Sequence, residues 1–238
     1  MDAARAFRPY GLAHLVVIGL TISLPFVFAA FARRSRWPRS ERVIARLLAG
    51  VLVFNYIGYE IYLALTIGLP WQKALPFQLC DWAMVAIIVA LLTGRERWLE
   101  VAYFWGIGGT LQAILTPDLK FAFPDLRFLT FFVAHSGIVV AIAFMMIMRR
   151  FRPHWVSIGR TFVWSELYFV LAIAVDLVTG ENYGYLLHKP QAASLLDALS
   201  DQRIVYILQM HLLALLFYLV LYLPFAVYDL FTGKKGHA

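Results

Sequence analysis

Two side chains of this sequence could together carry out nucleophilic chemistry: a cysteine and a histidine, each within an apolar stretch. Cys80 is the only cysteine among the 238 residues, so it is a thiol, and no intramolecular disulfide or CxxC redox site is possible. His135 lies deep in an apolar run. A thiol attacks an acyl ester only as the thiolate, and a histidine at the same depth could take its proton and later return it to the leaving alcohol. The pair therefore predicts acyl-group chemistry, provided that folding brings the two side chains together.

Further polar residues occur within apolar stretches, where an ionisable group costs at least about 2.5 kcal/mol and normally faces a protein interior or a wet cavity. Those expected near the pair are Glu60, Gln78, Asp81, Gln112, Gln209 and His211. Asp81 is a candidate catalytic residue. Gln112 is the first candidate for a side chain that donates to a tetrahedral oxyanion, and Gln78 is the second. Each has a structural alternative, because such residues often bond neighbouring helices and a lone buried cysteine often acts as a small apolar side chain.

The composition indicates a polytopic membrane protein built only from α-helices. Apolar residues make up 62% of the chain, charged residues 15%, and the mean hydropathy is +0.73. Runs of about 20 apolar residues can cross the roughly 30 Å of hydrocarbon as helices, and no stretch alternates like a barrel strand. The sequence predicts one domain, 1–238, with seven transmembrane helices at 11–32, 43–67, 76–93, 99–116, 127–148, 160–179 and 204–230.

The basic residues indicate how these helices are oriented. The net charge of +7 comes mostly from Lys and Arg in short connections, which is a topology signal and not a nucleic-acid-binding surface. The connections at 33–42, 95–97 and 149–160, with the C-terminal tail, hold 13 of these residues, whereas the N-terminal segment and the other connections hold 7. The positive-inside rule therefore predicts an outside N-terminus and a cytoplasmic C-terminus.

With that orientation, the polar residues fall mainly in the outer half of the bilayer. A rise of about 1.5 Å per residue puts Cys80, His135 and the polar residues named with them at similar depth, whereas Glu166 is the main exception in the inner half. One outward-facing polar cavity is expected. A transporter would instead need polar residues through both leaflets, and Glu166 keeps that alternative open. A metal site formed by His135, His211, Glu60 and Asp81 is chemically possible, but no HExxH-type pair appears, and we expect neither metal nor cofactor.

Several short stretches resemble the bacterial YwaF-like integral membrane proteins, which are similar to the eukaryotic transmembrane protein 164 family. The stretches are 75–81 (LPFQLCD), 104–112 (FWGIGGTLQ), 115–118 (LTPD), 131–137 (FFVAHSG), 181–183 (ENY) and 189–190 (KP). They run from the second predicted helix to the start of the last, so the resemblance covers most of the chain.

The resemblance implies a seven-helix phospholipid-remodelling acyltransferase of the bacterial cytoplasmic membrane, with a catalytic cysteine in the third helix and a histidine in the fifth. By motif, these roles fall on Cys80 and His135. One departure is that many relatives carry His where this chain has Gln78. The implied substrates are a phospholipid and a lysophospholipid, with a thioester intermediate between them; a hydrolase would use the same pair. Near the outer surface, Asn182 and Tyr183 could hold a lipid headgroup and Lys189 its phosphate.

Overall fold

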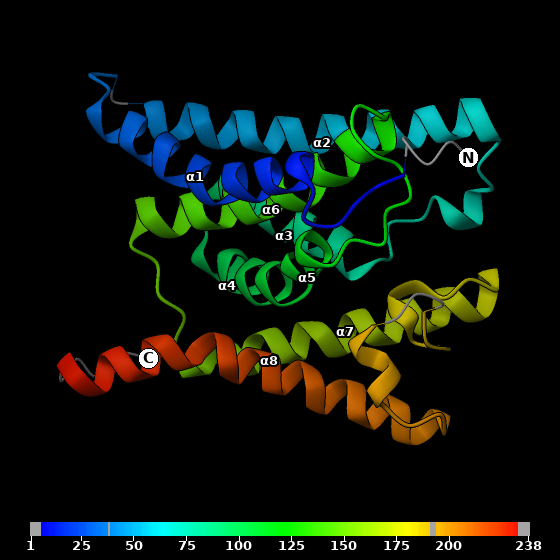
Figure 1. Ribbon diagram of the computed structural model, residues 1–238. Coiled ribbons are helices and arrows are strands. Elements are labelled where there is room, and N and C mark those ends of the chain that lie inside the picture. The colour runs from blue at the N-terminus through cyan, green and yellow to red at the C-terminus, as the bar shows by residue number, and fades with distance from the viewer. Residues whose placement is uncertain (1–5, 38, 191–193, 233–238) are drawn as a thin grey trace.

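The described part of the chain is all-helical apart from one isolated bridge between Ala6 and Phe121 (Figure 1). The computed structural model describes residues 6–37, 39–190 and 194–232. Its long helices are α1 (Leu12–Arg34), α2 (Ser40–Ile67), α6 (Leu126–Arg149), α7 (Trp155–Thr179) and α8 (Arg203–Thr232), and these five are long and apolar enough to cross a membrane. The shorter elements are η2 (Trp71–Lys73), α3 (Leu79–Thr93), α4 (Glu96–Trp105), η3 (Gly106–Thr110), α5 (Leu111–Leu115), η4 (Tyr183–Tyr185) and η5 (Leu195–Ala198).

Each of the seven predicted segments coincides with helical structure, and two differ in a way that matters for the site. The third helix begins at Leu79 and not at residue 76, because Gln78 is extended and its N–H donates to the Asp81 carboxylate at 3.0 Å. The fourth segment is divided by η3, a π-helical turn between α4 and α5. Arg5, Lys234 and Lys235 from the predicted charge count lie outside the described residues.

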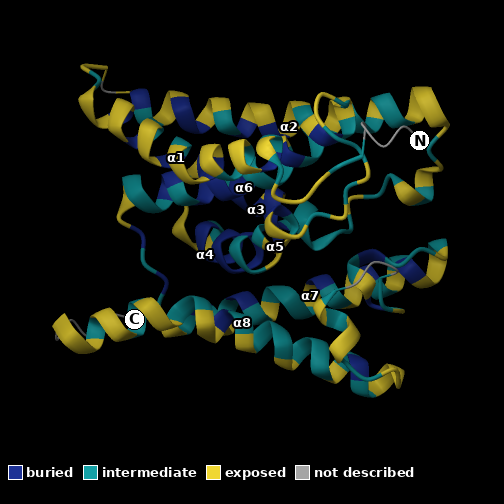
Figure 2. Ribbon diagram, in the orientation of Figure 1, coloured by how far each residue is buried: buried dark blue, intermediate teal, exposed yellow. Residues whose placement is uncertain are grey.

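The helices form three layers, as Figure 1 shows. α1 and α2 cover one side of α6, and α3 and α4 occupy the middle, where α3 contacts α2, α4 and α6. α7 and α8 pair on the opposite side, with α7 packed on α4. Figure 2 shows that buried residues concentrate in α3, α4 and α6, whereas the outer faces of α1, α2 and α8 are largely exposed, as expected for lipid-facing helices.

Small residues allow the central helices to approach closely. On α3, Ala83, Ala86 and Ala90 are at most 1% exposed. At Gly106, the first residue of η3, a Cβ atom would collide with Ile142 and would lie 3.1 Å from Ile138 of α6. The absence of a side chain at this position is therefore what lets the π-helical turn pack against α6.

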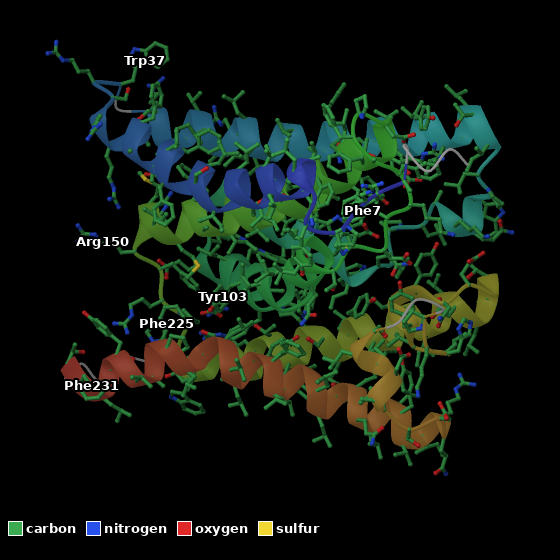
Figure 3. The ribbon with its side chains drawn as sticks, viewed as in Figure 1. Phe7, Trp37, Tyr103, Arg150, Phe225 and Phe231 are labelled. Carbon is green, nitrogen blue, oxygen red and sulfur yellow. The ribbon has the colours of Figure 1, made fainter. Side chains whose placement is uncertain are left out.

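Polar contacts join the α7–α8 pair to the central layer. The Tyr103 hydroxyl of α4 donates to the Leu221 carbonyl of α8 at 2.9 Å, and the Tyr103 and Phe225 rings meet edge to face, as can be followed in Figure 3. Nearby, the Trp105 indole donates to the Ser165 hydroxyl at 2.9 Å. These contacts set the position of α7 and α8 beside the helices that carry the candidate site.

Candidate functional site

Cys80 lies within the first turn of α3, where the helix leaves backbone N–H groups without intrahelical partners. We expected it just beyond that turn; the later helix start, fixed by the Asp81 carboxylate, brings it closer to the N-terminus. None of the hydrogen bonds of the described residues ends on the sulfur, and the Asp81 N–H donates to the Gln78 carbonyl at 3.0 Å. The dipole of the helix N-terminus favours negative charge on the thiol or on an oxyanion formed next to it.

His135 presents one free ring nitrogen. Its Nδ1 lies 2.7 Å from the carbonyl oxygen of Phe131, and because a carbonyl only accepts, Nδ1 carries the proton. The neutral imidazole therefore has its lone pair on Nε2, which makes no hydrogen bond with any described residue. The Phe131 ring, 4.2 Å away between centroids, holds the imidazole in place. His135 thus has the tautomer and the unoccupied nitrogen that a general base requires.

Cys80 and His135 lie at the same depth on neighbouring parallel helices. α3 and α6 contact each other, and at their C-terminal ends the Arg149 guanidinium lies 3.2 Å from the position of a Cβ atom at Gly94. Cys80 is 14 residues before Gly94, and His135 is 14 residues before Arg149. At about 1.5 Å per residue, both are about 21 Å from that end. The predicted common depth therefore agrees with the packing of the two helices.

The π-helical turn η3 packs against α6 on one side and against the first residue of α3 on the other. His135 shares a face of α6 with Ile138 and Ile142, three and seven residues later, and both isoleucines pack against Gly106 of η3. From the other side, Leu79, the residue before Cys80, contacts Gly109 of η3. The thiol and the imidazole are not hydrogen bonded to each other. Catalytic hydrogen bonds often shorten only once substrate is bound.

Carboxyl and phenol groups surround the thiol. Tyr56 of α2 is within electrostatic range of Cys80, Asp81 and Glu60, and Tyr168 of α7 is within range of Cys80 and Asp81. One oxygen of Glu60, Oε2, is buried and has no partner among the described residues. An unpaired buried carboxylate oxygen is costly, so it marks a position where a ligand hydroxyl could donate.

The connection between α7 and α8 closes over the start of α3. The Tyr168 hydroxyl donates to the Phe77 carbonyl at 3.0 Å, and Gly184 N–H donates to Oε1 of Gln78 at 3.2 Å. Gly184 has φ of +61°, and a Cβ atom there would collide with the Tyr168 hydroxyl. Burial raises the pKa of Tyr185, and the neighbouring Asp118 and Cys80 raise it further. This connection therefore lies directly beside the thiol.

Gln78 and Gln112 remain available as donors. Gln78 uses its side-chain oxygen to accept from Gly184, which leaves its amide nitrogen without a partner in the described structure. Gln112 is exposed on α5, and its side chain makes no hydrogen bond with the described residues. Of the two, Gln78 directly precedes the first turn of α3, so it lies nearer the sulfur along the chain.

Other residues expected at the site have structural partners. Asn182 bonds to His188 through its amide nitrogen and accepts from Leu187 and His188 through its oxygen. The Tyr183 hydroxyl donates to the Gln72 carbonyl. Lys189 reaches the Leu199 carbonyl at 2.6 Å and Asp201 at 2.7 Å, and Gln209 accepts from Ser200 N–H at 2.6 Å. These side chains hold the α7–α8 connection together, and a headgroup contact would have to displace those bonds.

His211 and Glu166 form a second polar pair, which we did not anticipate. We placed His211 in the outer half and Glu166 in the inner half, but His211 Nε2 lies 3.2 Å from a Glu166 oxygen. His211 Nδ1 donates to the Ile207 carbonyl at 2.7 Å, because a carbonyl only accepts. The hydrogen bond between Nε2 and the Glu166 carboxyl group therefore needs a further proton on one of these two groups. Both residues therefore occupy one level, and the depth estimate was wrong because it took each helix end as a fixed reference. In contrast to His135, His211 has no free nitrogen.

The sequence matches a known protein family over most of its length. A model of the TMEM164 family matches residues 9–222. The chain belongs to the TMEM164 family. It is also 29% identical over 226 residues to an uncharacterized protein of Treponema pallidum (strain Nichols), covering 92% of this chain and 90% of that protein. No solved structure matches the chain.

The match to the TMEM164 family extends from the residues before α1 into α8 and includes both Cys80 and His135. Together with the five long apolar helices, it identifies a multi-pass membrane protein of that family. The resemblance read from the short motifs is thereby confirmed.

The sequence interpretation missed three contributors to the site in this TMEM164 family member. Tyr56 precedes Glu60 by four residues and so shares its helix face, a signal that was available from spacing. Tyr168 lies in an apolar run and carries no such signal. The π-helical turn could have been suspected from the three glycines at 106, 108 and 109, since such turns occur frequently at functional sites.

Proposed function

We propose that this protein is a membrane-embedded Cys-His acyltransferase that moves a fatty acyl chain from a phospholipid to a lysophospholipid through a thioester on Cys80. The single observation that carries the proposal is the free Nε2 of His135, at the depth of the only thiol in the chain and on a helix that contacts α3. Membership of the TMEM164 family supports the same residues, because the matched region contains both.

In the first half-reaction, Nε2 of His135 takes the proton of the Cys80 thiol. The thiolate attacks the carbonyl carbon of a phospholipid ester, forming a C–S bond and a tetrahedral oxyanion. In this proposal, backbone N–H groups at the start of α3 and the Gln78 amide, whose nitrogen has no partner in the described structure, would donate to that oxyanion. The C–O bond then breaks, and the imidazolium returns its proton to the leaving alkoxide, which leaves the thioester on Cys80 and a free lysophospholipid.

The second half-reaction reverses these steps with another acceptor. A lysophospholipid hydroxyl gives its proton to Nε2 of His135 and attacks the thioester carbonyl. The C–S bond breaks, and the departing thiolate regains the proton from the imidazolium. The unpaired Oε2 of Glu60 is placed to accept a hydrogen bond from a lipid hydroxyl, which would orient the acceptor. Water in place of the lysophospholipid would make the same pair a hydrolase.

We further propose seven membrane spans in the bacterial cytoplasmic membrane, with the N-terminus outside. The two additional spans are α3 and the continuous helical run from α4 through η3 to α5, residues 96–115. This orientation puts the first turn of α3 near the outer headgroup layer, where phospholipid ester bonds lie. Alkaline phosphatase fused to the C-terminus should be inactive, and green fluorescent protein fused at the same point should be fluorescent. An active phosphatase fusion and a non-fluorescent second fusion would show that the orientation is the reverse.

The proposal is tested with purified protein in lipid vesicles that contain phosphatidylcholine and a deuterated lysophospholipid. Wild-type protein should produce deuterated diacyl phospholipid. Cys80→Ala and His135→Ala should each lower this rate at least about 100-fold, because removal of a general base typically costs 10²–10⁴-fold. His154→Ala, outside the site, controls for the loss of a histidine. Full activity in either site variant would end the assignment, and unlabelled free fatty acid as the only product would identify a hydrolase instead.

A further inference from the structure

α2 presents a line of four residues, each one helical turn from the next, that borders two apolar grooves. The line consists of Arg46, Gly50, Phe54 and Gly58. One groove, of about 480 Å³, lies between α2 and α3, and the other, of about 660 Å³, lies between α2 and α6; all four residues line both. Both volumes are in the usual range for ligand sites.

The two grooves are open and separated by one side chain. Phe54 is 81% exposed and stands between them as a ridge. At Gly50 and Gly58 the structure has nothing within 4 Å of the position that a Cβ atom would take. The glycines therefore leave the surface hollowed on both sides of Phe54.

Arg46 is the unusual member of this line. Most of the other Lys and Arg residues lie in a connection or at a helix end, whereas Arg46 falls within the predicted apolar segment 43–67. Arg160 lies almost as far into α7, but it is paired with Glu100. It is exposed and forms no ion pair with any described residue. Six residues into α2, it sits about 9 Å from the start of the helix. A guanidinium in that position is costly unless it reaches the headgroup layer or pairs with an anion.

The distance along the line matches one leaflet. Gly58 follows Arg46 by 12 residues, which corresponds to about 18 Å of helix, and one leaflet contributes about 15 Å of hydrocarbon. The line thus has a cation at one end, and two apolar grooves of about one leaflet in length begin beside that cation. These features match the charge and shape of a lipid with an anionic phosphate and two acyl chains.

We propose that α2 carries a binding site for one diacyl phospholipid, whose phosphate pairs with Arg46 and whose two acyl chains lie in the grooves on either side of Phe54. The site is separate from the candidate catalytic centre, because Leu52 and Tyr56 of the same helix face the other way, toward α6 and α3. With the proposed orientation, the phosphate lies on the cytoplasmic side, and the groove beside α6 continues to Leu126 and Leu129 in the first turn of that helix.

Native mass spectrometry of the full-length protein, released from detergent with dioleoyl phosphatidylglycerol, tests the charge component. Wild-type protein should retain one phosphatidylglycerol more than the Arg46→Gln variant, apart from any lipid at the catalytic centre. It should retain no dioleoylglycerol at this site, because that lipid has the same chains without a phosphate. Arg46→Gln should weaken the affinity about tenfold, whereas Arg97→Gln, at another exposed arginine of the same membrane side, should not. Equal retention of the two lipids, or equal weakening by both variants, would overturn the proposal.

Filling the grooves tests the apolar component. A Cβ atom at Gly50 or Gly58 meets nothing within 4 Å, and both residues border open grooves, so Gly50→Leu and Gly58→Leu should fold while obstructing the chains. Gly19→Leu on α1 is the matched control, since Gly19 is equally open. Phosphatidylglycerol should raise the thermal midpoint of wild-type and Gly19→Leu protein by more than that of the groove variants, which keep only the catalytic centre as a lipid site. A rise in thermal midpoint as large as that of wild type in both groove variants would contradict the proposed position of the acyl chains.

Discussion

The central helices and the α7–α8 pair are held in place by different interactions. α6 buries nine of its 24 residues, all of them apolar, whereas α8 buries two of its 30, both tyrosines. The α7–α8 side is joined to the centre by hydroxyl, amide and ion-pair contacts, including the bidentate bond of Arg160 to the buried Glu100. Packing thus fixes the helices that position Cys80 and His135, and directional bonds fix the part that covers Cys80.

This difference predicts separate consequences for two kinds of substitution. A change in the centre should lower the stability of the whole molecule, since tightly packed interiors respond even to one added methylene. A change in the bonds of the α7–α8 connection should cost less stability and should instead expose the thiol. Because Cys80 is the only cysteine, the rate of its reaction with a maleimide reports that exposure directly.

The largest effect is expected at the contact between η3 and α6. Gly106→Ala adds a methyl group that collides with Ile142, so we expect a loss of about 1–3 kcal/mol of stability, measured as a lower thermal midpoint. Gly108→Ala is the matched control, because its new Cβ would make an ordinary contact, 3.6 Å from Leu221. Equal midpoints for the two variants would mean that the centre is not closely packed at η3.

A smaller effect on stability, with a larger effect on exposure, is expected at Gly184. Gly184→Ala forces an alanine into a left-handed conformation, at a cost of about 1–2 kcal/mol, and pushes its methyl group against the Tyr168 hydroxyl. Gly180→Ala has a comparable φ of +76° but open space around it. Maleimide should react faster with Cys80 in Gly184→Ala than in Gly180→Ala. Equal rates would show that the α7–α8 connection does not restrict access to the thiol.

Removing one hydroxyl should have a still smaller effect. Tyr168→Phe deletes the bond to the Phe77 carbonyl, which costs about 0.5–1.5 kcal/mol, and keeps the ring against Trp82. We expect a modest decrease in thermal midpoint and faster labelling of Cys80. A labelling rate unchanged from wild type would show that this bond does not restrict access.

The smallest effect is expected at the exposed N-terminus of α6. The Arg127 guanidinium holds the pKa of Asp125 below its usual value of about 3.9, so the stabilisation is present at neutral pH and is lost as the pH falls through the lowered pKa. Asp125→Ala should cost about 1 kcal/mol at pH 7, since Asp125 also caps the helix. The difference in stability between wild type and Asp125→Ala, measured by melting curves, should be smaller below pH 4 than at pH 7. A difference that does not change with pH would show that only the cap, and not the ion pair, stabilises the helix.

Much of the fold could be predicted from the sequence because membrane helices are encoded by the length of their apolar runs. Segment 127–148 was found within one residue at each end as α6. The start of α3 could not be placed, because it depends on Asp81 accepting from the backbone of Gln78 and not on hydropathy. The division of the fourth segment at η3 was missed for a similar reason, since it follows from the contact of Gly106 with α6.

The chemistry of the candidate site stays a prediction, and the partners of its residues could not be predicted from the sequence. Cys80 and His135 stood out as rare residues in apolar runs, and counting residues gave their common level. The pairing of His211 with Glu166, and the use of Asn182, Lys189 and Gln209 within the α7–α8 connection, depend on side-chain directions that helix spacing does not encode.

The acylation of Cys80 is tested most directly by intact-mass measurement of the purified protein after incubation with a phospholipid of one defined acyl chain. The account predicts a species heavier by that single acyl group, removed by hydroxylamine and absent from Cys80→Ala. Protein of unchanged mass under turnover conditions, or an adduct that persists in Cys80→Ala, would contradict it.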